Sequence, residues 1–156
     1  MTSVHRDIIA ALTTAIQAGV ADTSAWSFYV EEPVRHNPNG QHCAIWFEGD
    51  TVNDQHNSTG DIDVTDLYGI RYWEPAPLKS QKYVDEDAAV GIEDLMDQVR
   101  TIIQKNQVGL GTSYSTMYRG SRKFIGQDST PSGTQVNDQV AGFEIAVTAR
   151  RRIGRT

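Results

Sequence analysis

The sequence predicts an α+β fold, a two-layer sandwich with an antiparallel or mixed sheet of about 4-5 strands and two helices packed on one face. Two observations carry this prediction. Residues 85–106 repeat apolar side chains at the spacing of one helical face, and residues 142–152 alternate apolar and polar side chains as a half-buried strand does. A chain of 156 residues is most simply one domain, so residues 1–156 are expected to fold together.

The first helix is expected from Ser3 to Ala18. Its apolar residues recur at helical spacing, Ser3 is a suitable N-cap, and Gly19 is suited to ending the helix. The longest apolar run in the chain, residues 8–12, is too short to span a membrane, so no membrane partner is expected. The N-terminus also lacks the basic region and apolar core of a signal peptide.

Two strands are expected next, Trp26 to Glu32 and His42 to Glu48. Both are rich in aromatic and branched residues, and Pro33 ends the first. The turn between them contains Asn-Gly, which favours a hairpin. Residues 50–60 are polar and are expected to form an exposed loop or a hairpin tip.

A third strand is expected from Ile62 to Glu74. Its alternation breaks at Leu67, which predicts a bulge or bend near Asp66. The central helix follows, with acidic residues at its start, Asn106 at its end, and an apolar face made of Ala88, Ile92, Leu95, Val99 and Ile102.

Two strands are expected after the central helix, Tyr114 to Arg119 and Gly142 to Arg152. The segment between them, residues 120–137, is polar and rich in glycine, serine and threonine, so it is interpreted as a long mobile loop. Long loops are therefore expected at about 49–61 and 120–138.

Charge is divided unevenly along the chain. Residues 1–100 hold 6 basic and 17 acidic side chains, giving −11, whereas residues 101–156 hold 8 basic and 3 acidic, giving +5 and a net charge of −6. Two solvated faces would account for this division; a charge-complementary, head-to-tail contact between copies would make use of it. The basic cluster near the C-terminus is short, which makes direct nucleic-acid binding a weaker interpretation.

The histidines and the cysteine do not form a convincing metal site. His36, His42 and His56 lack the spacing of a ligand pair, and the adjacent His42 and Cys43 would point to opposite faces of a strand. The single cysteine has no disulfide partner, which fits a reducing compartment or a buried thiol.

The aspartates at 61, 63 and 66 resemble a calcium loop only superficially, because its glycine and distal glutamate are missing. Charges on an edge strand, where they discourage aggregation, are the preferred interpretation. The sequence contains no G-x-S-x-G and no H-E-x-x-H motif. We therefore expect no enzymatic activity, no metal and no cofactor.

The order and size of these elements resemble the tail terminator proteins of long-tailed bacteriophages, the family that includes the lambda tail terminator. The resemblance is carried by the opening helix RDIIAALTTAIQAG, the strands WSFYVEE and HCAIWFEGD, the central helix, and the final strand GFEIAVTARRR. It covers nearly the whole chain as an order of elements, and no catalytic or binding motif is part of it.

This resemblance implies a structural virion protein that forms a ring, usually a hexamer. The ring would cap the tail tube, end tail polymerisation and provide the joint to the head-side connector. The implied partners are other copies of the chain, the tail tube protein and a head–tail connector or stopper protein, in a virion tail or neck assembled in the host cytoplasm. Genomic DNA would pass through the lumen without specific binding, because strong phosphate contacts would slow it.

Within this hypothesis the two long loops are expected to reach neighbouring subunits or adjoining rings. Charged side chains are the candidate inter-subunit contacts: Asp61, Asp63, Asp66, Glu93, Asp94, Asp97, Arg119, Arg122, Lys123, Arg150 and Arg152. The alternatives are a head-completion or connector protein, acting as a stopper or adaptor, a small soluble enzyme, and a generic adaptor domain.

Overall fold

The structure, a computed structural model, describes residues 3–33, 40–56, 60–77, 86–106, 115–129 and 135–154. These residues form two helices and five strands: α1 (Val4–Gly19), β1 (Trp26–Tyr29), β2 (Gln41–His56), β3 (Asp61–Pro77), α2 (Glu86–Asn106), β4 (Ser115–Ser129) and β5 (Gln135–Ile153). Neither helix, over its described residues, has both the length and the apolar character that crossing a membrane requires.

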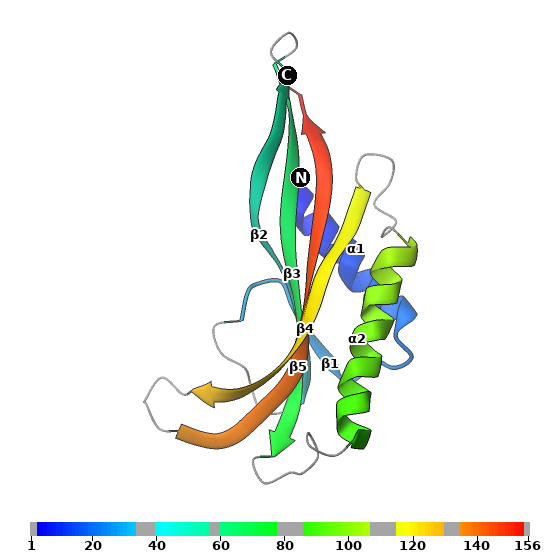
Figure 1. Cartoon of the computed structure of the whole chain (residues 1–156), viewed down its shortest axis with the longest axis vertical. Helices are drawn as coiled ribbons and strands as arrows, with labels where there is room; N and C mark the ends of the chain where they lie inside the picture. Colours follow the sequence, from blue (N-terminus) through cyan, green and yellow to red (C-terminus); the bar gives the residue numbers. More distant parts are fainter. Residues whose placement is uncertain are drawn as a thin grey trace.

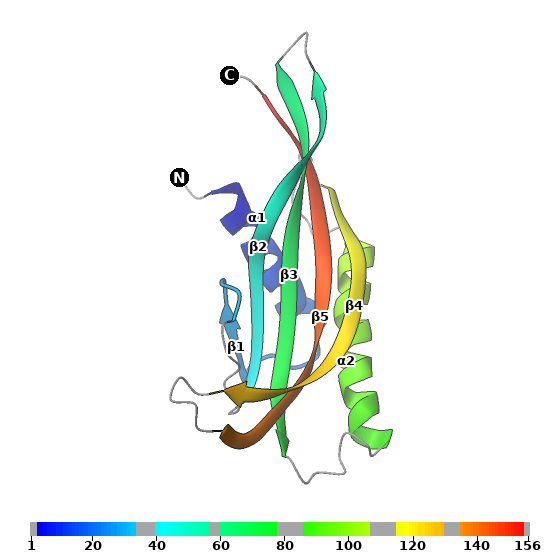
Figure 2. The ribbon, with the colours of Figure 1, turned by 60° about the vertical axis from the view of Figure 1, so that its left-hand side comes forward.

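The strands form one mixed sheet in the order β1-β2-β3-β5-β4. β1 pairs with β2 in parallel, and the remaining neighbours pair antiparallel. Both helices pack on the same face of this sheet, where their buried side chains share one core with the strands (Figures 1 and 2). The predicted α+β sandwich is confirmed, and its sheet is of the mixed kind.

The first two strands do not form the expected hairpin. β1 runs parallel to β2, with Trp26 opposite Gln41 and Tyr29 opposite Ala44. A parallel pair requires the chain to travel back along the strand before the next strand begins, and residues 30–40 provide a connection longer than a hairpin turn. β1 therefore ends earlier than predicted, and most of the predicted Asn-Gly turn lies outside the described residues.

The main core lies between the helices and one face of the central strands. Alternate side chains of β2, β3 and β5 are buried there: Cys43, Ile45, Tyr68, Ile70, Tyr72, Phe143, Ile145 and Val147. The helices approach each other at Gly19, where a Cβ would lie 2.5 Å from the Ile102 Cδ1 atom. Only a residue without a side chain permits this contact.

Both helices lie where the sequence predicts them. Ser3 is the N-cap of α1, and its Oγ accepts a hydrogen bond from the Arg6 backbone N–H at 3.2 Å. Gly19 is the last residue of α1, and Asn106 is the last residue of α2. The predicted apolar face of α2 is buried at Ile92, Val99 and Ile102 and partly buried at Leu95, while the Ala88 side chain lies outside the described part.

The two segments predicted as loops belong largely to strands. β2 and β3 remain paired from His42↔Trp73 as far as His56↔Asp61, so a hairpin tip replaces a long loop. β4 and β5 pair as far as Ser129↔Gln135, so the mobile-loop prediction for residues 120–137 is wrong for most of that segment. The paired ends of β2 and β3 extend past the helices, and the β4–β5 hairpin curves away from α2 (Figures 1 and 2). The helices do not cover these segments, so the sequence lacks the alternation that marks a half-buried strand.

The irregularity predicted near Asp66 lies on the neighbouring strand. The β2–β3 register shifts between Phe47 and Gly49, so Glu48 has no residue opposite it on β3. Gly49 pairs with Leu67, next to Asp66. Its φ of 151° is in the region that favours glycine, which is how the chain accommodates the extra residue.

Candidate assembly interface

The β2–β3 hairpin projects beyond the two helices at one end of the molecule (Figure 1). We call residues 50–56 and 61–66 the arm. The end of β5 pairs with nearly the whole β3 side of the arm, from Asp66↔Ala149 to Ile62↔Ile153. Val52 in the arm is 56% exposed. Thr51, Val52 and Asn53 have exposed side chains, whereas Val64 and Asp66 are buried. The β2 side of the arm is therefore the part accessible to a neighbouring molecule.

Ion pairs tie the last strand to the arm. The Asp66 carboxylate is fully buried and accepts a hydrogen bond from Arg151 Nε at 2.5 Å. Asp63 accepts from Arg152 Nε at 3.0 Å and lies 3.8 Å from Arg150 Nη2. β3 lies between β2 and β5, so the interpretation of these aspartates as edge-strand charges is wrong. They connect adjacent strands within the sheet.

The other candidate contacts also have partners within the chain. Asp61 interacts with another group of the same chain. The remaining contacts are the ion pairs Glu93–Lys123, Asp97–Arg100 at 3.3 Å and Arg122–Glu144 at 2.9 Å, and the hydrogen bonds from Gln98 to Asp94 and from Arg119 to Thr148, both at 3.2 Å. Exposed pairs of this kind contribute little stability, so a neighbouring subunit can replace them at small cost. The candidates are spread over the arm, α2 and β4, and their contact with another subunit stays a prediction.

The face of the sheet opposite the helices, which we call the helix-free face, carries a second apolar cluster. Ala44, Trp46, Trp73 and Val140 are buried in it, with Phe124 packed against them. Sequence reasoning did not select these residues. A signal was present, because the run HCAIWF is almost continuously apolar, and such a run marks a strand covered on both faces.

Polar groups are fixed between the aromatic rings of this face. The Arg71 guanidinium lies 5.4 Å from the centroid of the Trp46 ring and forms an ion pair with Glu144. The same carboxylate binds Arg122, so one acid holds two arginines from neighbouring strands.

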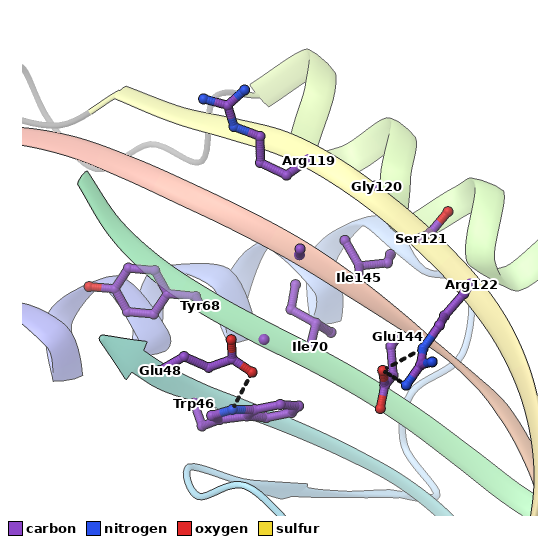
Figure 3. A pocket seen from close by; sticks show the side chains of 12 residues that line it. Trp46, Glu48, Tyr68, Ile70, Arg119, Gly120, Ser121, Arg122, Glu144 and Ile145 are labelled. Atoms are coloured by element: carbon purple, nitrogen blue, oxygen red, sulfur yellow. Dashed lines mark hydrogen bonds and ion pairs between the residues drawn. The ribbon is translucent and has the colours of Figure 1, made fainter. Parts of the chain in front are cut away.

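A hollow of about 280 Å³ opens on the helix-free face. Its floor is made of small residues aligned across β3, β5 and β4: Gly69, Ala146 and Gly120. Trp46 and Glu48 of β2 stand on one side and Arg119 and Arg122 of β4 on the other, as Figure 3 shows. The hollow therefore has an acidic wall and a basic wall.

The structure gives no support to chemistry at Cys43. The side chain is buried, and burial raises the pKa of its thiol to about 12, so the group remains protonated near neutral pH. Of the two expectations for the single cysteine, the buried thiol is confirmed. Over the described ranges no three His, Cys, Asp or Glu side chains lie together as metal ligands, and His36 falls outside those ranges.

A mixed sheet with two helices on one face and strand ends that project beyond them defines the class of fold. No family model and no curated protein matches the sequence. Among solved structures, the chain is similar to one described as the PVC sheath/tube terminator, in the extended state, of an extracellular contractile injection system. The two chains share 13% identity with a TM-score of 0.56. The match covers 100% of this chain and 58% of the other, so this chain spans little more than half the length of that protein. The fold is therefore tail terminator-like.

Proposed function

We propose that this chain is a tail terminator, a structural subunit that assembles into a ring at the end of a tail tube and stops its growth. The observation that carries the proposal is the similarity in fold to a sheath/tube terminator, which extends over the whole of this chain. The resemblance in element order to phage tail terminators points to the same function. In this proposal the chain has no enzymatic activity and binds no cofactor.

The proposed partners follow from the same function. They are further copies of the chain, in a ring that the phage resemblance makes a hexamer, the tail tube protein, and a head-side connector or stopper protein. A sheath protein is a further candidate, because the similar structure is described as terminating both sheath and tube. The chain would then be found in the tail or neck of a virion, with genomic DNA passing through its lumen.

The projecting strands supply the surfaces that such a ring needs. The arm extends past the helices, and its charges are held in place by buried and partly buried ion pairs. We assign to the arm, to the β4–β5 hairpin and to the exposed residues among the predicted charged contacts the role of meeting neighbouring subunits or the tube. Asp66 is buried, so its role is to support the arm. The helices, with their apolar faces in the core, support these strands.

Polymerisation of the tail tube provides the test. Purified tube protein is allowed to polymerise with and without this chain, and tube lengths are measured by electron microscopy. The proposal expects shorter tubes as the ratio of this chain to tube protein rises, with a ring visible at one end. Equal length distributions at every ratio would reject a terminator function.

A further inference from the structure

Both edges of the sheet have strand backbone that is not fully paired. β4 pairs with β5 on one side, and no strand of the described part lies on its other side. β1 covers the outer edge of β2 from Gln41 to Ala44, so in the described residues β2 has no strand neighbour on that side from Ile45 onward. An open strand edge is a template on which another chain can pair.

The two open edges carry charges of opposite sign. Arg119, Arg122 and Lys123 are exposed on β4, whereas Glu48 and Asp50 are exposed on the open part of β2. Charges on edge strands commonly keep sheets apart, because an added strand would have to bury them. Edges of the same sign would also repel each other. Opposite signs at the two edges attract, and they do so in one orientation only.

We propose that copies of this chain associate head to tail, with the basic β4 edge of one subunit against the acidic β2 edge of the next. The inference rests on the proposed function in taking the partner to be a second copy of the chain. A contact between two different surfaces repeats from subunit to subunit and closes into a ring when the rotation between subunits allows it.

Glu48 and Arg119 are the residues best placed for this contact. Both lie on the helix-free face, because the Glu48 carboxylate accepts a hydrogen bond from Trp46 Nε1 at 3.2 Å and Arg119 Nε donates to Thr148 Oγ1 at 3.2 Å. If the sheets of two subunits lie edge to edge, these side chains meet on the same face. Both are exposed, so their own short-range contacts leave their charge available to a neighbour.

Charge reversal tests the pairing directly. The variant Glu48→Lys places a basic group on the acidic β2 edge, and Arg119→Glu places an acidic group on the basic β4 edge. Each variant alone should therefore associate at least about tenfold more weakly than the wild type. An equimolar mixture should recover association, because each mixed contact joins opposite charges. Association is measured by sedimentation velocity as a function of concentration, and urea unfolding verifies that each variant is folded.

The neutral variants Glu48→Gln and Arg119→Gln are the matched controls. Glu48→Gln keeps the hydrogen-bond acceptor for Trp46, and each should fall between the wild type and the reversal at the same site. The proposal is overturned if both reversed variants associate as strongly as the wild type, or if their mixture does not recover association. It is also overturned if the wild type remains a single chain at about 1 mM. If the edge contact is rejected but the chain still caps tubes, the terminator function stands. If the mixture recovers association but the chain does not cap tubes, only the terminator function is rejected.

Discussion

Trp46 and Gly69 face each other across β2 and β3 on the helix-free face, and their fit is close. A Cβ at position 69 would lie 2.3 Å from Trp46 Cζ2, so any larger residue must displace the indole ring. We predict that Gly69→Ala lowers the free energy of unfolding by about 1–3 kcal/mol, measured by urea unfolding.

Gly91 on α2 provides the matched control for that substitution. No atom lies within 4 Å of a Cβ built there, and the residue is exposed in a helix. Gly91→Ala should therefore raise stability by about 0.5–1 kcal/mol, because alanine favours the helix. Equal effects at the two positions would show that Trp46 does not constrain position 69.

Cys43 gives a prediction of pH dependence. Burial raises the pKa of its thiol from 9.0 to about 12, so above pH 9 the unfolded chain releases a proton that the folded chain retains. The contribution to stability is complete below pH 9 and is lost as the pH rises towards 12, by about 1.4 kcal/mol per pH unit. Urea unfolding at several alkaline pH values should show a steeper loss for the wild type than for Cys43→Ala. Parallel curves would contradict the assignment of a buried, protonated thiol.

At the scale of single elements, the base of the arm depends on one buried ion pair. Asp66 is fully buried, and the Arg151 side chain is 16% exposed. Arg151→Met leaves the carboxylate buried without this partner, and we predict a loss of about 3–5 kcal/mol in the free energy of unfolding. Hydrogen exchange should also become faster at residues 61–66, because the arm loses its buried side-chain link to the end of β5.

The neighbouring Arg152 is the control for this prediction. Its pair with Asp63 is on the exposed side of the strand, where the arginine side chain is 57% exposed. Arg152→Met should cost no more than about 1 kcal/mol. Comparable losses in the two variants would mean that burial does not distinguish the pairs.

The elements that bury one face could be predicted from the sequence, and the others could not. α1 and α2 repeat apolar residues at helical spacing, and residues 142–152 alternate cleanly, so their positions followed from periodicity. The end of β2 lies beyond the helices and the β4–β5 hairpin curves away from them, so the helices impose no apolar face that would reveal these segments (Figure 1). The parallel pairing of β1 depends on the path of the connecting chain, which composition does not determine.

The candidate site was predicted less completely than the fold. Charged residues were selected because of their charge alone, and the structure gives them partners in the chain. The sequence does not indicate where each charge lies relative to the sheet edges. Arg119 and Glu48 belong to opposite edges only because β5 returns between β3 and β4, a topology that no local pattern encodes.

At the scale of the whole molecule, the structure divides into a packed body and strands that project from it (Figures 1 and 2). The helices and one face of the sheet hold most of the buried apolar residues. The arm and the sheet edges carry exposed charges, among them Asp50, Arg119 and Arg152, and strand backbone with no neighbouring strand in the described part. Such a division suits a subunit whose function is contact with other subunits, because the contact surfaces can vary without loss of the core.

The position of the chain on a tail tube tests the central claim most directly. Tubes assembled in the presence of the chain carrying a heavy-atom label are imaged by electron microscopy, and the position of each label along the tube is recorded. A terminator predicts labels confined to one end of each tube, in a ring. Labels distributed along the tube wall, or tubes without labels, would contradict the assignment.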